Sequence, residues 1–286
     1  MTYFLDLRVD TSGGDVAREV TPRLDSTVCP LDNLLAKIKG KEILLGAHGF
    51  NVNRNDGIES LSLWERKLQL PASTMFIGIL WPGDAKLPIF VDYPMEGDEA
   101  IGSGNLLAQF LDNYFAEVTS LSFVSHSLGA RMVLQTISAM QQKRVRSLVL
   151  MAGAIENNCL SVEYETAADK VEGISILASR GDWVLAGAFP LGNLVRDLID
   201  RDHPYWSEAL GREGPDGTAR DNVRPNWQIP DNWNYGHLDY LKQNDGGPLP
   251  PPVDIPPVPD PPEPPPEPPT DTSAWSAGFT STRLMA

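Results

Sequence analysis

Short apolar runs alternate with helical patterns over the first two thirds of this 286-residue chain. The runs are nearly continuous in Ile, Leu, Val and Phe, which is typical of strands buried on both faces of a parallel sheet. They are residues 41–47, 74–81, 120–125, 146–153 and 173–179, and helical patterns lie between them at 59–70, 105–118 and 129–142. This alternation predicts an α/β fold with a mostly parallel central sheet, flanking helices and right-handed crossovers. An opening run, residues 3–9, predicts an additional edge strand.

Composition divides the chain into a body and a tail. We expect residues 1–247 to form one catalytic domain, with an aromatic excursion at 183–235 that holds four of the seven tryptophans. Those tryptophans form either a small core of their own or a wall for substrate. Residues 248–270 are a Pro-rich polyproline II segment, with 14 of the 25 prolines between 248 and 269. The apolar end, 271–286, is predicted to anchor on another subunit or on its own, with a simple disordered linker as the alternative.

Charge and hydropathy restrict the partners. A net charge of −15 without clustered Lys and Arg argues against nucleic acid and against anionic membranes. No stretch approaches about 18 consecutive apolar residues, and the start lacks a basic region followed by an apolar run. The sequence therefore predicts a soluble, cytoplasmic protein with no membrane span. Two cysteines, Cys29 and Cys159, are too few for a disulfide framework and are expected to be thiols in or near the core.

A strand-like run turns into a helical pattern within LSFVSHSLGARMVL, residues 121–134, with Ser127 at the corner. A serine there is often only a helix cap. In the G-x-S-x-G turn of hydrolases, however, the serine is a nucleophile in a strained conformation, and the residues two before and two after it must be small. Ser125 and Gly129 stand in those places. The serine in place of the first glycine is a departure that is still small.

A second loop offers donors for an oxyanion. The strand that ends at Ala47 is followed by HGFNV, residues 48–52, where Gly49 permits a tight turn. In hydrolases with this turn, one backbone N–H comes from such a loop and another from the residue after the nucleophile. The donors would be Phe50 and Leu128. The alternative is a strand-ending turn without a catalytic role.

Four histidines leave few choices for the general base. His48 lies in the proposed oxyanion loop and His126 lies inside the serine turn, so neither can easily present its ring to Ser127. His203 and His237 remain. Gly236 predicts a flexible loop before His237, ahead of an apolar helix, which suits a mobile base and favours His237 over His203.

The acid of a triad follows a strand end and lies between nucleophile and base in the sequence. Asp182 stands just past the strand that ends near Ser179. Its role would be to orient the imidazole and to stabilise its cationic form. A solvated turn aspartate is the alternative reading of this residue, and Asp169 and Asp200 are the rival acids.

Together the motifs HGFNV, WPGD, SHSLGARMVL, MAGAI, SRGDWVL and YGHLDYL resemble the α/β-hydrolase superfamily. The resemblance is narrower to the bacterial esterase/lipase-like hydrolases of the former domain of unknown function 900, and it covers roughly residues 40–243. It implies a triad of Ser127, Asp182 and His237 and the hydrolysis of esters. The Pro-rich tail is not part of it.

These observations predict a serine hydrolase that cleaves carboxylic esters through an acyl-enzyme intermediate and uses no cofactor. Trp183 and His48 are the candidate substrate-binding residues. The expected partners are a small-molecule ester and a second copy of the chain, bound through the C-terminal tail. Neither a metal cluster, a calcium loop nor a dinucleotide fingerprint is complete. The alternatives are a thioesterase or amidase, and a binding or assembly protein that keeps the fold and works through the tail.

Overall fold

The computed structural model describes residues 1–9, 15–68, 70–83, 89–141, 144–186, 208–216, 220–225 and 227–241, with the backbone alone at 89–97 and 241. The predicted Pro-rich segment and C-terminal anchor, residues 248–286, lie outside the described residues, as do residues 187–207, 217–219 and 226 of the aromatic excursion.

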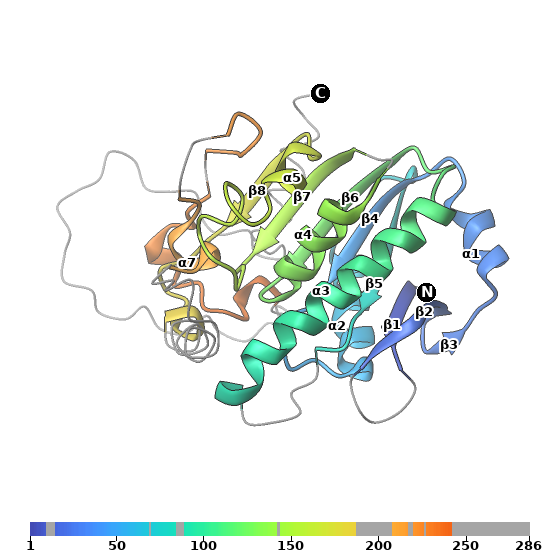
Figure 1. Ribbon diagram of the computed structural model, residues 1–286, viewed down its shortest axis with the longest axis horizontal. Helices are drawn as coiled ribbons and strands as arrows, with labels where there is room; N and C mark the ends of the chain where they lie inside the picture. The colour runs from blue at the N-terminus through green and yellow to red at the C-terminus, as the bar shows by residue number, and fades with distance from the viewer. Residues whose placement is uncertain are drawn as a thin grey trace.

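An eight-stranded sheet forms the centre of the molecule, in the order β3-β2-β1-β5-β4-β6-β7-β8 (Figure 1). The strands are β1 Tyr3–Arg8, β2 Val16–Leu24, β3 Thr27–Val28, β4 Glu42–Ala47, β5 Thr74–Leu80, β6 Ser120–His126, β7 Val145–Met151 and β8 Ile174–Leu177. Along the part of the sheet that runs β1-β5-β4-β6-β7-β8, every neighbouring pair is parallel. The pairs of β1 with β2 and of β2 with β3 are antiparallel. The predicted α/β fold with a mostly parallel sheet is thereby confirmed.

The opening strand is in the interior of the sheet, so the prediction of an edge strand is wrong. β1 pairs with β2 on one side and with β5 on the other. Its side chains Phe4, Leu5 and Leu7 are fully buried. The sequence analysis missed β2 because its residues, VAREVTPRL, include two arginines, a glutamate and a proline, as suits a half-exposed strand near an edge.

The helices pack against this sheet, and α3 and α4 lie side by side across one face (Figure 1). The helices are α1 Leu31–Ile38, α2 Arg54–Lys67, α3 Ile89–Tyr114, α4 Gly129–Ala139, α5 Glu165–Asp169 and α7 Leu210–Glu213, with 3-10 turns η1 Asp231–Trp233 and η2 Asp239–Leu241. The three predicted helices are present with shifted ends. α2 begins before the predicted residue 59 because the Asn53 side chain caps it, accepting hydrogen bonds from the N–H groups of Asn55 and Asp56.

A continuous apolar core surrounds the sheet, and two of the excursion's tryptophans contribute to it. Trp227 and Trp233 pack against the main core rather than against a separate one. Cys159 is buried and Cys29 is half-buried, both as free thiols. Among the described residues, no helix is long and apolar enough to cross a membrane.

Candidate active site

Ser127 lies where β6 ends and α4 begins, at the carboxyl edge of the parallel strands. Its φ is 53°, a left-handed conformation that costs a residue with a Cβ atom some strain. The turn is held by its own backbone, because Ser127 N–H donates to the Met151 carbonyl and Ala154 N–H donates to the Ser127 carbonyl. A strained serine at a strand-to-helix corner is the conformation expected of the G-x-S-x-G turn, and it differs from the extended conformation of an ordinary helix cap.

Glycines let the oxyanion loop approach this turn closely. A Cβ atom on Gly129 would lie 2.4 Å from the His48 carbonyl oxygen, and one on Gly49 would lie 2.9 Å from Ser127 Cβ. Larger residues at either position would push the two loops apart. Ser125, where hydrolases carry the first glycine, is fully buried, so its extra atoms fit inside the sheet.

His237 brings the three predicted triad residues together. Its Nε2 lies 2.9 Å from Ser127 Oγ, and its Nδ1 lies 2.8 Å from Asp182 Oδ2. A carboxylate can only accept, so Nδ1 carries the ring proton and donates to Asp182. Nε2 is then the acceptor for the Ser127 hydroxyl. The geometry places a base beside the serine and an acid behind the base, as nucleophilic catalysis requires.

Asp182 is held rigidly behind that histidine. Its side chain is fully buried, and its second oxygen, Oδ1, accepts the Leu185 N–H at 2.9 Å. Of the two rival acids, only Asp169 lies among the described residues, and it is engaged elsewhere. Asp169 ends α5 and forms an ion pair with Arg220. Asp200 lies outside the described residues, as does the rival base His203.

The loop that carries His237 is tied down on both sides, although Gly236 predicts a flexible one. Ser179 Oγ–H donates to the Tyr235 carbonyl at 2.6 Å, and Gly236 N–H donates to the Asp239 carboxylate at 2.5 Å. In the described part, the predicted apolar helix after His237 is the short turn η2, which buries Tyr240. The base is therefore positioned by the strand ends and by contacts within its own loop.

His48 is predicted to bind substrate, but the structure places its ring in the interior. Its side chain is 2% exposed, its Nδ1–H donates to the Gly49 carbonyl at 2.9 Å, and its ring stacks on Trp81. Arg8 Nη2 donates to its Nε2 at 3.3 Å. Burial and then the Arg8 charge lower the pKa of His48 to about 3, so the ring is neutral. This side chain braces the oxyanion loop and does not line a substrate pocket.

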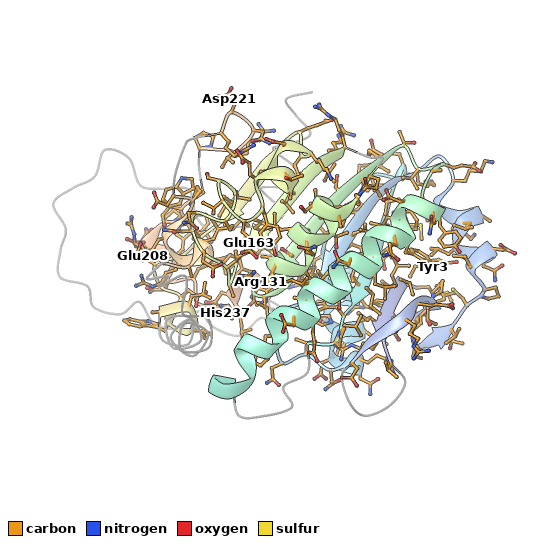
Figure 2. All side chains as sticks on the ribbon, viewed as in Figure 1. Tyr3, Arg131, Glu163, Glu208, Asp221 and His237 are labelled. Carbon is orange, nitrogen blue, oxygen red and sulfur yellow. The ribbon has the colours of Figure 1, made fainter. Side chains whose placement is uncertain are left out.

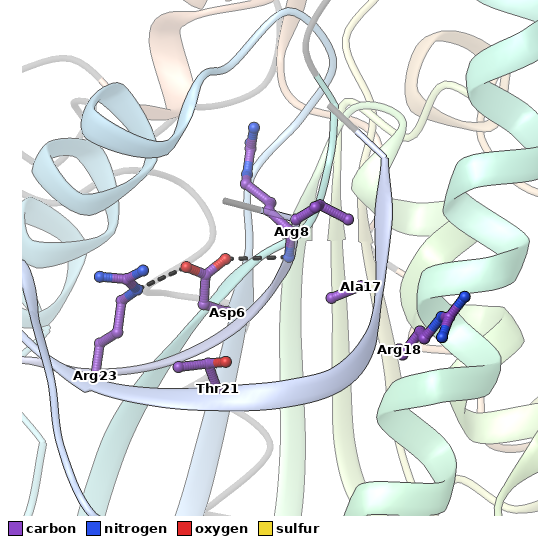
Figure 3. Close-up of a pocket in the computed structure, with 7 residues that line it drawn as sticks. Asp6, Arg8, Ala17, Arg18, Thr21 and Arg23 are labelled. Atoms are coloured by element: carbon purple, nitrogen blue, oxygen red, sulfur yellow. Dashed lines mark hydrogen bonds and ion pairs between the residues drawn. The ribbon is translucent and has the colours of Figure 1, made fainter. Parts of the chain in front are cut away.

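Arg8, which the sequence analysis did not single out, completes that brace from β1. Arg8 donates to the His48 ring and also to the Val52 carbonyl. One buried guanidinium therefore holds the first and the last residue of the oxyanion loop, residues 48–52. Figure 3 shows this side chain extending away from the neighbouring pair of Asp6 and Arg23, whose Oδ2 and Nε lie 2.6 Å apart. Two charged residues, Asp6 and Arg8, alternating with apolar ones in a short strand were the signal available in the sequence.

A cavity of about 310 Å³ lies beside the hairpin formed by β1 and β2, and none of the three predicted triad residues lines it. Its lining comes from β1, β2 and the residue after β1, and the members that carry charge are Asp6, Arg8, Arg18 and Arg23 (Figure 3). Both oxygens of Asp6 are already engaged, by the Arg8 N–H and by the guanidinium groups of Arg23 and Arg54. The cavity is therefore part of a polar framework behind the oxyanion loop.

Arg131 anchors the helix that follows Ser127. It is buried in α4 and pairs with Glu156 at 2.9 Å and with Glu163 at 2.5 Å. Figure 2 shows Arg131 and Glu163 next to each other, on the same side of the molecule as His237. These pairs tie the first turn of α4 to the loop after β7, whose Ala154 N–H also donates to the Ser127 carbonyl.

Three predicted residues remain: Trp183, Phe50 and Leu128. Trp183 follows Asp182 directly and is 81% exposed. Leu238, which was not predicted, follows His237 and is 65% exposed. Phe50 lies half-buried in the oxyanion loop. Leu128 begins the turn into α4, and its N–H makes no hydrogen bond to another described group. Among the described residues no group of three His, Cys, Asp or Glu side chains could hold a metal ion.

Known structures include several esterases and lipases with partial similarity to this chain. Acetyl xylan esterase 1 from Thermoanaerobacterium sp. is 14% identical over 78% of this chain and 76% of its own, with a TM-score of 0.39. Esterase B from Lactobacillus rhamnosis is 12% identical over 58% and 62%, with a TM-score of 0.30. For LipS and LipT, two metagenome-derived lipolytic enzymes, the identity is 10% over 41% and 43%, with a TM-score of 0.27. This chain spans only 27% of phospholipase PlaB from Legionella pneumophila. No curated protein sequence matches the chain.

A family model matches residues 25–217, which is more than half of the chain. The matched segment contains the serine turn, the oxyanion loop and Asp182, and it ends before His237. Together with the mostly parallel sheet, this match assigns the fold and the family. The chain belongs to the alpha/beta hydrolase family of unknown function DUF900.

Proposed function

We propose that this protein is a serine hydrolase that cleaves carboxylic esters through an acyl-enzyme intermediate. The observation that carries the proposal is the continuous hydrogen-bonded line from Ser127 Oγ through the His237 ring to the buried Asp182 carboxylate. A serine hydroxyl is a poor nucleophile until a base takes its proton, and this line supplies that base in the correct tautomer.

In the first half of the reaction, Ser127 Oγ attacks the ester carbonyl and its proton moves to His237 Nε2. The imidazolium that forms is stabilised by Asp182, which stays ionised. His237 then gives the proton to the departing alkoxide as the C–O bond breaks, leaving the acyl group on Ser127. In the second half, His237 takes a proton from water as the water oxygen attacks the acyl carbon. The bond between the acyl carbon and Ser127 Oγ then breaks, His237 returns the proton to Ser127 Oγ, and the acid product leaves.

The negative charge on the carbonyl oxygen would be stabilised by the backbone N–H groups of Phe50 and Leu128. The close approach of the oxyanion loop to the serine turn, through Gly49 and Gly129, supports this role. Donors fixed in advance at such a site are worth about a hundredfold to a thousandfold in kcat each. The braces through His48 and Arg8 would maintain that geometry.

The substrate in this proposal is a small-molecule ester, and no cofactor takes part. Trp183 would contact the apolar part of the ester, since it is exposed directly beside the acid of the triad. The division into a catalytic domain of residues 1–247 and a C-terminal anchor that pairs subunits remains part of the proposal, as does the cytoplasmic location.

A fluorophosphonate probe tests the nucleophile. The wild type should be labelled and should hydrolyse p-nitrophenyl esters, while Ser127→Ala should fold normally and lose labelling and at least about a thousandfold in kcat. Ser125→Ala is the matched control, because this serine is buried two residues earlier on the same strand. It should keep both signals. Labelling that persists in Ser127→Ala, or that disappears in Ser125→Ala, would contradict the assignment.

A further inference from the structure

We propose that His126, which precedes the nucleophile, is a positioning residue that fixes the backbone of His237, so that the end of β6 holds both the nucleophile and the base. This inference rests on the proposed function, because it assigns the base to His237. His126 was not expected to act as the base, because its place inside the serine turn keeps its ring from Ser127. In the structure its ring contacts the main chain of His237 instead.

The contact is direct and buried. His126 is the last residue of β6, its side chain is 4% exposed, and its Nε2 lies 2.7 Å from the His237 carbonyl oxygen. A carbonyl oxygen only accepts, so Nε2 carries the proton and donates. The two rings are also in contact, with centroids 4.8 Å apart. The bond therefore holds the peptide group that leaves His237 toward Leu238.

This bond has no substitute in the described part of the chain. The other ties of the loop are made by its neighbours: the Tyr235 carbonyl and the Gly236 N–H before His237, and the Tyr240 hydroxyl after it, which donates to the Leu177 carbonyl at 3.3 Å. Among the described residues, His126 makes the only hydrogen bond to the main chain of His237. Next to it, Leu238 is exposed and gives the loop little packing. Without the donor, the backbone at His237 would lose this hydrogen bond, the one that it makes within the described part of the chain.

The same ring lies against the oxyanion loop. A Cβ atom on Gly49 would be 3.1 Å from His126 Nδ1, which means that the ring and the Gly49 backbone are in close contact. His126 is thus packed between the loop of the base and the loop of the oxyanion donor. A shift of this side chain would displace both loops relative to Ser127, and displacements near 1 Å cost about a hundredfold in rate.

A neutral donor suits this place because His237 becomes a cation during the reaction. A second charge so close would oppose the proton transfer from Ser127. Burial first, and then the neighbouring His237, lower the pKa of His126 to about 3. The ring therefore donates its hydrogen bond without placing a charge beside the base, which a lysine or arginine could not do.

Two variants separate the hydrogen bond from the volume of the ring. His126→Met fills the space without a donor and should lower kcat for p-nitrophenyl acetate about tenfold to a hundredfold, with KM within about twofold of wild type. His126→Gln places an N–H close to the position of Nε2 and should keep kcat within about fivefold of wild type. Thermal melting of both variants shows whether the protein is folded. A kcat for His126→Met within twofold of wild type, or an equal loss in both variants, would overturn the proposal.

Nitrogen-15 NMR of histidine-labelled wild type tests the contact without measuring turnover. His126 should be the Nε2–H tautomer at pH 7, and a ring protonated at Nδ1 alone would overturn the proposal. In His126→Met, the His237 Nδ1–H signal should exchange with water at least about tenfold faster, and an unchanged rate would also overturn it. If the wild type neither turns over esters nor reacts with fluorophosphonate, the proposed function fails, while these two spectra still decide whether His126 holds His237.

Discussion

The segment that matches the family and the two segments that flank it contribute different parts of the candidate site. Residues 25–217 contain Ser127, Asp182 and the oxyanion loop. The flanking segments contain the proposed base, His237, and the residue that braces the proposed oxyanion loop from behind, Arg8. The matched segment alone would leave the serine without a base.

Pairing along the sheet explains how the flanking segments reach the site. The chain after residue 220 bonds in parallel alongside β8, through the bridges of Ile174 with Val223 and of Ala178 with Gln228. A segment that runs parallel to the strands reaches the carboxyl edge, where Ser127 and Asp182 already lie. At the other end, β1 inserts between β2 and β5 and carries Arg8 to the oxyanion loop. In this protein, a family match to the centre of the sheet therefore does not cover the whole candidate site.

The largest test of this comparison removes the base that the flanking segment supplies. His237→Ala should lower kcat by about the same factor as Ser127→Ala, and the double variant should lose little more, because members of a triad act as a unit. Steady-state hydrolysis of p-nitrophenyl esters measures this. His203→Ala is the control and should stay within about threefold of wild type. The reverse order of the two losses would move the base into the aromatic excursion.

A smaller effect is expected at the other flank. Arg8→Met removes the donor to His48 and Val52 while keeping most of the side-chain volume, so the oxyanion loop should lose part of its support. We expect kcat to fall about tenfold, with KM nearly unchanged, because the donors act on charge that develops in the transition state.

Arg23→Met is the matched control for the arginine in β1. This side chain is buried in the same hairpin, pairs with Asp6 and donates to the Ser26 carbonyl.

 The bonds of Arg23 go to Asp6 and to the Ser26 carbonyl, so its loss should lower the melting temperature and leave kcat within about twofold of wild type. Equal losses of kcat in the two arginine variants would show that the hairpin supports the fold as a whole and not the loop.

The pH dependence of stability tests the burial of two histidines of the matched segment, His48 and His126. Burial lowers the pKa of both His48 and His126 to about 3, against about 6.5 in an unfolded chain. Below pH 6.5 the unfolded chain takes up a proton at each ring, whereas the folded chain does not until about pH 3. The free energy of unfolding should therefore decrease as the pH falls through this window, with a slope approaching about 1.4 kcal/mol per pH unit for each ring.

Urea unfolding at pH 7, 6 and 5 measures that slope. Carboxylates contribute as well near pH 5, so the informative quantity is the difference between wild type and variant. His126→Gln should remove the share of one ring, about 1 kcal/mol per pH unit between pH 6 and 5. A slope identical to that of wild type would mean that His126 takes up its proton equally in the folded and unfolded chains.

The smallest effect on catalysis is expected from the tail, which lies beyond both the matched segment and the base. Truncation after Gly247 should leave the turnover of small esters within about twofold of wild type, because the triad precedes it. If residues 248–269 were wholly polyproline II, they would extend on the order of 65 to 70 Å, enough to reach a neighbouring subunit. Light scattering and thermal melting compare the two forms. Identical mass and melting temperature would rule out the anchor and leave a simple linker.

The sequence alone determined the α/β fold, because strands buried on both faces must be continuously apolar and helices between them must carry one apolar face. It also predicted the corner at Ser127, where small neighbours and the switch from strand to helix are local properties. The strand ends at Ala47 and near Ser179 likewise indicated where the oxyanion loop and Asp182 would lie.

Only the tertiary structure decided which groups support these residues. Arg8, His48 and His126 are bonded across separations of about 40 to 111 positions along the chain, and such contacts leave no periodic pattern in the sequence. The sequence suggested a substrate contact for His48 and a flexible loop for His237, but burial turned the first ring inward and hydrogen bonds tied the second loop to the strand ends. The physical reason is that buried polar groups must find partners, and which partners are near is set by how the strands pair and not by the local sequence.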